Sequence, residues 1–157
     1  LPYKRPIWIY VGRVAVEKNI KAFLDLDLEG TKVIIGKGPN LNKLKKKYPN
    51  DFFLGEKTNG ELASHFASSD VFVFPSKTDT FGIVVLESLS CGTPVAAYPV
   101  PGPKDILGGS KIDTLDQDLK TSALKALKVN REDCLEFAKK YSWEETARIF
   151  YNNISPN

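Results

Sequence analysis

Five short apolar segments recur along the 157-residue chain, and a predicted helix separates each from the next. The apolar segments are Ile7–Val11, Thr31–Ile35, Asp51–Gly55, Val71–Phe74 and Pro94–Tyr98. The helices expected between them are Glu17–Leu28, Leu41–Tyr48, Thr58–Ser68 and Phe81–Cys91. Near-continuous apolar runs are typical of strands buried on both faces, as in parallel sheets. Their alternation with helices predicts the α/β class, a three-layer sandwich in which helices cover both faces of one parallel sheet.

The rest of the chain is expected to be mostly helical. A stiff loop, Pro99–Pro103, follows the fifth strand, and a short helix is expected to start at Pro103. The polar stretch Gly108–Asp118 predicts a loop. Three helices are then expected, at Leu119–Val129, Arg131–Tyr141 and Trp143–Asn153.

Length and composition favour one soluble domain that spans residues 1–157. The net charge of +3, from 22 basic and 19 acidic residues, is too small to indicate nucleic-acid binding. Four lysines on the helix Leu41–Tyr48 have two interpretations, a solvated helix face or a patch for acidic lipid or nucleic acid, and we favour the first. Cys91 and Cys134 lack a CxxC motif or a histidine cluster, so no metal site is expected. Two cysteines without a disulfide framework fit a reducing cytoplasm best. No apolar run approaches the ~20 residues that span a bilayer, so we expect a soluble protein.

Glycine and proline follow the predicted strands. Gly12, Gly36, Gly55, Pro75 and the loop Pro99–Pro103 all come at or just after a strand's end. The carboxyl ends of parallel strands lie at one edge of a sheet, which is where open α/β folds bind their ligands. The sequence therefore predicts a binding site at this edge.

Two cations follow the first strand in VGRVAVEKNI, Arg13 and Lys18. Gly12 permits a tight turn before them, and cations around the start of the next helix suit the grip of a pyrophosphate. The alternative is that both are ordinary surface cations.

The only charged side chain between Asp79 and Lys104 is Glu87, on a helix that is otherwise apolar. A buried carboxylate needs a hydrogen-bonding partner, and the neighbours of Glu87 at helical spacing indicate a face that is not solvated. Gly82 at the helix start lets an anion approach the free N–H groups of the first turn. A phosphate there would bring the attached sugar's hydroxyls to Glu87. A structural ion pair or an exposed position is the alternative.

The sequence Asp79-Thr80-Phe81-Gly82, with Glu87 eight positions after Asp79, resembles the acid-x7-acid motif of GT-B glycosyltransferases, in particular the retaining family 4. The resemblance runs from Tyr10 to Phe150 and implies a Rossmann-like sheet, the C-terminal half of the two-domain GT-B fold. It implies that Glu87 binds the ribose and that Asp79, where the family commonly has Glu, lies near the donor sugar.

The resemblance also extends to the pattern G-R-x4-K, which implies that Arg13 and Lys18 contact the donor diphosphate. It places the loop after the third strand beside the nucleobase. The binding residues it implies are Gly12, Leu54, Gly55, Glu56, Phe81, Gly82, Ile83, Val84 and Glu87.

The function implied is transfer of a hexose from a UDP- or GDP-linked donor to an alcohol acceptor, a glycan or lipid, with retention and without a metal. The acceptor-binding N-terminal domain is expected to be missing from this chain, so the isolated chain should be inactive. The parent enzyme would be cytoplasmic, with contact at the inner face of the membrane left open. The alternatives are a non-catalytic nucleotide- or partner-binding module, and a GT-B-like nucleotide-sugar epimerase or phosphorylase. A phosphorylase would need a lysine-bound cofactor site that the sequence does not offer.

Overall fold

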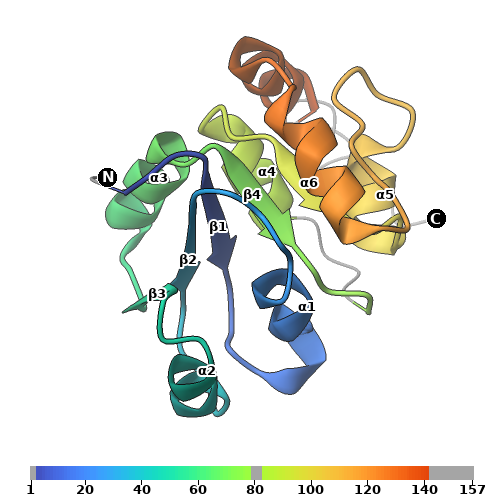
Figure 1. The fold of residues 1–157 in the computed structure, drawn as a ribbon. Coiled ribbons are helices and arrows are strands. Elements are labelled where there is room, and N and C mark those ends of the chain that lie inside the picture. Colours follow the sequence, from blue (N-terminus) through green and yellow to red (C-terminus); the bar gives the residue numbers. More distant parts are fainter. Residues whose placement is uncertain (1–2, 79–82, 142–157) are drawn as a thin grey trace, which may run out of the picture.

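A computed structural model describes residues 3–78 and 83–141 and shows one five-stranded sheet (Figure 1). Its strands are β1 (Ile7–Val11), β2 (Thr31–Ile35), β3 (Phe52–Gly55), β4 (Val71–Phe74) and β5 (Val95–Ala97). All neighbouring strands pair in parallel, in the order β3-β2-β1-β4-β5. The predicted parallel α/β architecture is therefore confirmed, and the strand bounds agree within two residues.

Helices lie on both sides of the sheet. They are α1 (Ile20–Leu24), α2 (Leu41–Lys47), α3 (Asn59–Ser68), α4 (Ile83–Ser90), α5 (Pro101–Leu107) and α6 (Leu119–Leu127), with a 3₁₀ turn at Val16–Lys18 and a further helical stretch over residues 131–141. The helix predicted from Trp143 lies outside the described residues.

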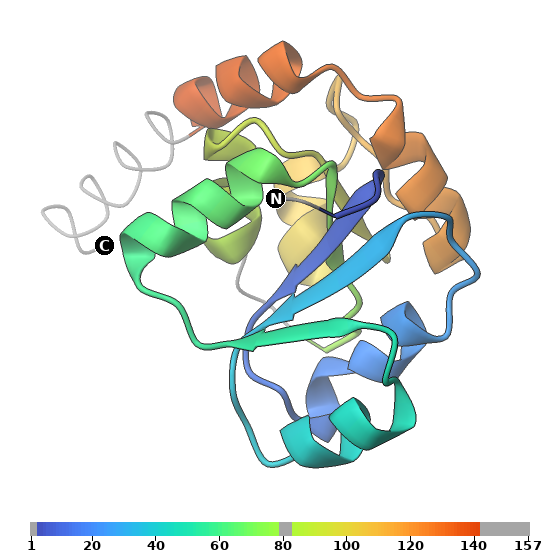
Figure 2. The same ribbon diagram turned by 60° about the vertical axis from the view of Figure 1, so that its left-hand side comes forward.

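Alternate residues of β1 point to two separate apolar cores. Ile7 and Ile9 are fully buried in a core shared with α3, α4, α5 and residues 131–141. Trp8 and Tyr10 lie in the other core, with α1, α2 and α6. Figure 2 shows α1 and α2 on one side of the sheet and α3 on the other. The alternation follows from the two-residue period of a strand, and it fixes a three-layer sandwich with helices on each face.

The helix predicted over Glu17–Leu28 is wrong in its extent. The chain forms the short 3₁₀ turn and then the five-residue α1, because Asn19 between them adopts the left-handed conformation with φ of 58°. Asparagine tolerates that conformation better than most residues do. The helix predicted from Pro103 begins two residues earlier, at Pro101, since proline fits the first turn of a helix, where its missing N–H costs nothing.

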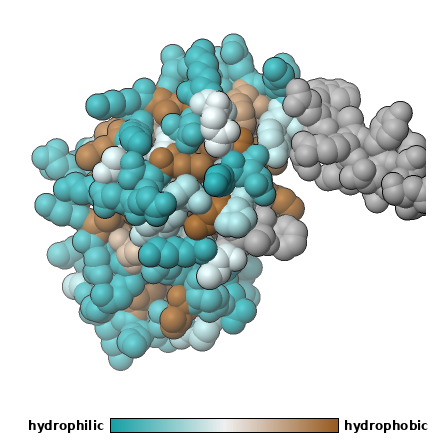
Figure 3. Space-filling view, turned by 90° about the vertical axis from the view of Figure 1, so that its right-hand side faces the viewer, coloured by the Kyte–Doolittle hydropathy of each residue, from teal (hydrophilic) through white to brown (hydrophobic). Residues whose placement is uncertain are grey.

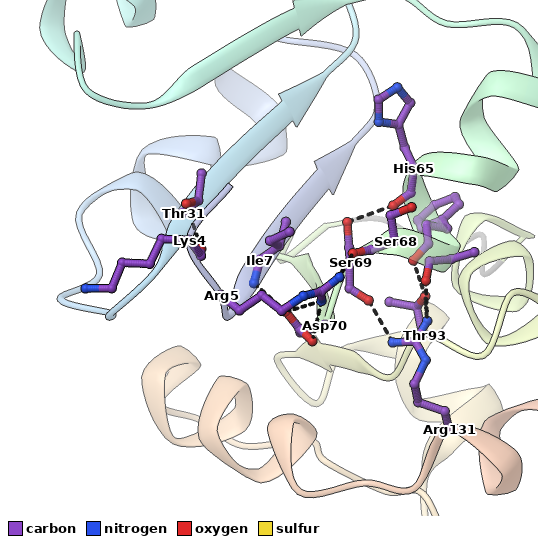
Figure 4. A network of polar contacts seen from close by, with 12 residues as sticks. Lys4, Arg5, Ile7, Thr31, His65, Ser68, Ser69, Asp70, Thr93 and Arg131 are labelled. Carbon is purple, nitrogen blue, oxygen red and sulfur yellow. Dashed lines mark hydrogen bonds and ion pairs between the residues drawn. The ribbon is translucent and has the colours of Figure 1, made fainter. Parts of the chain in front are cut away.

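A network of polar contacts closes the edge of the sheet opposite the strands' carboxyl ends (Figure 4). One carboxylate oxygen of Asp70 accepts a 2.6 Å hydrogen bond from the Ile7 backbone N–H, and Arg5 reaches both of its oxygens at 3.0 Å. Nearby, Arg131 donates to the carbonyls of Ser69 at 2.7 Å and Ala67 at 2.8 Å. These contacts join β1 and the helix at residues 131–141 to the turn between α3 and β4.

Asp70→Ala is expected to lower the free energy of unfolding by about 1–3 kcal/mol, because the buried Ile7 N–H loses its acceptor. Arg5→Ala is the matched control. Its side chain is 57% exposed, so its loss should cost no more than about 1 kcal/mol. Urea denaturation of both variants measures the difference. Equal losses would show that the ion pair, and not the backbone hydrogen bond, is what Asp70 contributes.

One face of the molecule carries mostly polar side chains, and its hydrophobic residues lie in small separate groups (Figure 3). The lysines of α2 are all exposed, as both interpretations of this helix face require: Lys43, Lys45, Lys46 and Lys47. Within the described part of the chain, no helix has the length and apolar character required to cross a membrane.

Candidate functional site

The strand order reverses between β1 and β4. The loops that follow these two strands therefore run apart and leave a crevice at their carboxyl ends, the place where open α/β sheets bind ligands. A cavity of about 360 Å³ lies there, and we call it the switch-point cavity. Its lining includes Gly12, Arg13, Lys18, Pro75, Ser76 and Val84.

A second and larger cavity, of about 790 Å³, adjoins it, and we call it the loop cavity. Its lining comes from the loops after β1, β2 and β3 and includes Gly36, Lys37, Gly38, Glu56 and Lys57. Val11, Gly12 and Arg13 line both cavities, so the two form one continuous site. The predicted gathering of strand-end loops at this edge is confirmed for the first four strands.

The backbones of the loops that form the site lie very close to one another. The Gly12 N–H donates to the Ile35 carbonyl at 3.0 Å, and the Gly36 N–H donates to the Gly55 carbonyl at 2.9 Å. A Cβ atom at Gly36 would lie 1.8 Å from the Gly12 oxygen, and one at Gly38 would lie 2.2 Å from the Val14 oxygen. Only glycine allows backbones to approach this closely, so the shape of the site depends on these residues.

The two predicted cations, Arg13 and Lys18, come together at the switch-point cavity. Arg13 is exposed, and its backbone carbonyl accepts a 2.8 Å hydrogen bond from the Tyr10 hydroxyl. Lys18 ends the 3₁₀ turn that follows. The acid Glu17 lines the same cavity. Among the described lining residues, two cations stand against one acid, which gives the cavity a net positive lining that suits an anionic ligand.

Asn19 connects the two sides of the crevice. Its side-chain Nδ2 donates a 2.9 Å hydrogen bond to the carbonyl of Pro75, the residue directly after β4. The same residue breaks the helix that was predicted from Glu17. At the break, the hydrogen bond from Asn19 holds the turn that carries Lys18 against the loop after β4.

The residues predicted beside the nucleobase do not all face the site. Glu56 lines the loop cavity and forms a 3.0 Å ion pair with Lys37, which lines it too. Leu54 instead packs against the apolar core, because its side chain points to the opposite face of β3 from its neighbours. Gly55 contributes its backbone carbonyl to the contact with Gly36. Glu56 is thus the side chain of the three that could contact a ligand in this cavity.

Glu87 lies in a groove of about 460 Å³ between α3 and α4, which we call the α3–α4 groove. Leu62 lines this groove and also the loop cavity, so the two are neighbours. The inference that Glu87 is on an unsolvated face is wrong, since Glu87 is exposed and Ile83, one turn before it, is 65% exposed. That face of α4 looks outward because Val85, Ser88 and Leu89 are the residues that turn toward the sheet.

The thiol of Cys91, four residues after Glu87, also lines the α3–α4 groove. Burial, and the charge of Glu87 beside it, raise the pKa of Cys91. Of the residues predicted at the start of α4, Val84 lines the switch-point cavity and Ile83 the α3–α4 groove. Asp79, Phe81 and Gly82 lie outside the described residues.

Sequence reasoning missed several lining residues, namely Lys37, Gly38, Pro39, Leu41, Lys57, Leu62 and Ser76. The run Gly36-Lys37-Gly38-Pro39 after β2 carried a usable signal, because two glycines so close together indicate a backbone that approaches another segment. Over residues 3–78 and 83–141, no cluster of three or more His, Cys, Asp or Glu side chains could hold a metal ion.

Sequence comparison gives a consistent set of relatives. The family model described as "Glycosyl transferases group 1" matches residues 1–140. A sulfoquinovosyl transferase of Arabidopsis thaliana is 39% identical over 109 residues, which are 66% of this chain and 21% of the relative. A GDP-mannose-dependent alpha-mannosyltransferase of Mycolicibacterium smegmatis is 39% identical over 112 residues, covering 68% of this chain and 29% of the relative. The chain thus spans less than a third of the length of these two relatives.

Solved structures share the fold. Sucrose-phosphate synthase from Thermosynechococcus elongatus superimposes with a TM-score of 0.74 at 20% identity, over 97% of this chain and 46% of that one. The catalytic domain of a cholesterol-alpha-glucosyltransferase from Helicobacter pylori gives a TM-score of 0.64 at 19% identity, over 87% of this chain and 99% of that one. The arrangement of strands and helices is therefore one that glycosyltransferases use.

Proposed function

The chain belongs to the group 1 glycosyltransferases, and on that premise we propose that it is the nucleotide-sugar-binding domain of a retaining, metal-independent hexosyltransferase. The observation that carries the proposal is the meeting of Arg13 and Lys18 at the switch-point cavity. The acceptor, a lipid or a glycan, would bind to a part of the protein beyond this chain. The donor would carry UDP or GDP, and one relative is named as GDP-mannose-dependent.

The proposed site has a separate place for each part of the donor. The diphosphate would occupy the switch-point cavity, between Arg13, Lys18 and the start of α4. The base would occupy the loop cavity beside Glu56, and the ribose hydroxyls would face Glu87. In the donor the ribose lies between the base and the diphosphate, and the α3–α4 groove adjoins both of the other hollows. Leu62 lines this groove and the loop cavity, while the consecutive residues Ile83 and Val84 of α4 line the groove and the switch-point cavity.

The chemistry of such a site is electrostatic. When the bond between sugar and diphosphate breaks, negative charge grows on the departing phosphate oxygens. Arg13 and Lys18 would stabilise that charge in the transition state more than in the bound donor, which lowers the barrier. We assign no nucleophile to this chain, and we propose Asp79 as the acid near the donor sugar.

Glu87→Gln is expected to weaken nucleoside diphosphate binding about tenfold, because a neutral amide replaces the carboxylate that accepts from the ribose hydroxyls. The matched control is Glu136→Gln, an exposed acid on residues 131–141 that should bind as the unmodified chain does. A 2′,3′-dideoxynucleoside diphosphate lacks both hydroxyls, so it should bind Glu87→Gln and the unmodified chain equally. A persisting tenfold difference with the dideoxy ligand would exclude ribose recognition by Glu87.

Calorimetric titration of the chain with UDP, GDP and ADP in EDTA tests the proposed function. We expect one diphosphate to bind without metal and with the highest affinity, which would also identify the base. Binding only when Mg²⁺ is added would contradict metal independence. Transfer of a sugar by the isolated chain would contradict the proposal that its acceptor site lies elsewhere.

A further inference from the structure

Ser76 follows β4 directly after Pro75 and lines the switch-point cavity. The residue is only 3% exposed. Its side-chain Oγ is buried and has no hydrogen-bond partner among the described residues. A buried hydroxyl without a partner is unfavourable and is rare in native proteins, so this one calls for an explanation.

Other buried serines of the chain do have partners. Ser69 Oγ donates to the His65 carbonyl at 2.8 Å, and Ser88 Oγ donates to the Thr93 carbonyl at 2.8 Å. Ser122 Oγ accepts a 2.9 Å hydrogen bond from the Ala97 backbone N–H. Ser76 differs from all three in having no such partner, and it lines the switch-point cavity, which suggests that its partner is something the cavity binds.

The surroundings of Ser76 indicate what that partner is. Arg13 and Lys18 line the same cavity, so an anion is favoured there, and an anion accepts hydrogen bonds. The acid in the lining, Glu17, does not accept from Ser76. The nearby Pro75 carbonyl accepts from Asn19 and does not accept from Ser76. The hydroxyl is therefore left to donate into the cavity.

We propose that Ser76 is a diphosphate-binding residue, whose Oγ–H donates a hydrogen bond to a phosphate oxygen of the donor. This inference rests on the proposed function. Ser76 follows a buried strand, and the bond from Asn19 to Pro75 holds its loop, so the donor group is fixed in place before the ligand arrives. An unpartnered buried hydroxyl costs the free protein free energy, and the diphosphate recovers this cost when it binds and accepts the hydrogen bond.

The test compares Ser76→Ala with Ser122→Ala, a buried serine whose hydroxyl is bonded away from the site. Affinity for UDP, GDP and inorganic pyrophosphate is measured by calorimetry, and the unfolding temperature is measured without ligand. Ser76→Ala should weaken pyrophosphate and the bound nucleoside diphosphate by the same factor, about tenfold or 1.4 kcal/mol. It should leave the unfolding temperature unchanged or raised. Ser122→Ala should lower that temperature and leave affinity unchanged.

A second variant, Ser76→Cys, keeps the size of the side chain but has only a weak donor, so it should bind as weakly as Ser76→Ala. Equal affinity of Ser76→Ala and the unmodified chain would overturn the inference alone. So would unfolding of Ser76→Ala in the absence of ligand, which would assign the hydroxyl a structural role. Absence of any diphosphate binding by the unmodified chain would instead refute the proposed function.

Discussion

Gly36→Ala is expected to destabilise the chain by about 3–4 kcal/mol and to abolish nucleoside diphosphate binding. Gly36 has φ of +142°, a conformation that side chains rarely adopt, which by itself costs about 1–3 kcal/mol. Its new Cβ would also lie 1.8 Å from the Gly12 oxygen, so the loops after β1 and β2 must separate. Arg13 is on the loop that moves, and both cavities would lose their shape.

Substitutions at two other glycines distinguish the cost of the backbone conformation from the cost of the contact between loops. Gly55 also has a positive φ, of +76°, but a Cβ there meets nothing within 4 Å, so Gly55→Ala should cost only about 1–2 kcal/mol. Gly60→Ala, in α3 and with equally open space, should cost nothing. Urea denaturation and UDP or GDP titration of the three variants give both readouts. If Gly36→Ala and Gly55→Ala lose equal stability, the contact between loops is not what makes Gly36 necessary.

Arg13→Ala is expected to weaken nucleoside diphosphate binding between about tenfold and a hundredfold. A hydrogen bond to a charged group contributes about 1.5–3 kcal/mol, and the guanidinium fork matches two phosphate oxygens at once. Arg13 is exposed, and it lines both the switch-point and the loop cavities, so its loss should change affinity far more than stability. Calorimetry with the best-binding diphosphate measures the change.

Lys45→Ala is the matched control for charge, because Lys45 is an exposed cation on α2 and lines neither cavity. Its affinity should equal that of the unmodified chain at low and at physiological salt. If Lys45→Ala weakens binding as much as Arg13→Ala does, the affinity depends on the net charge of the protein and not on a defined site.

The sequence was sufficient to predict the sheet and the meeting of the two cations. Ile7–Val11 and Val71–Phe74 are so apolar that only strands buried on both faces accommodate them, and both bounds agree with the structure. Arg13 and Lys18 were found because Gly12 marks a strand end, and strand ends of a parallel sheet share one edge. Local sequence thus determines which residues reach that edge.

Contacts between distant segments could not be predicted in the same way. The helix break at Asn19 is stabilised by a hydrogen bond to Pro75, a residue 56 positions away. The close approach of Gly36 to Gly12 likewise exists only once β1 and β2 are paired. Glu87 was placed on an unsolvated face because its apolar neighbours at helical spacing do not reveal which side of α4 packs on the sheet.

The most direct test of the account is to map the binding site by NMR, following the backbone amides of the ¹⁵N-labelled chain during titration with UDP and GDP in EDTA. The account predicts that the largest shifts come from the crevice and the loops beside it, at Gly12, Arg13, Gly36 and Ser76, while α6 stays unchanged. Shifts that concentrate on the lysines of α2, or that spread evenly over the surface, would contradict a diphosphate site at the point where the strand order reverses.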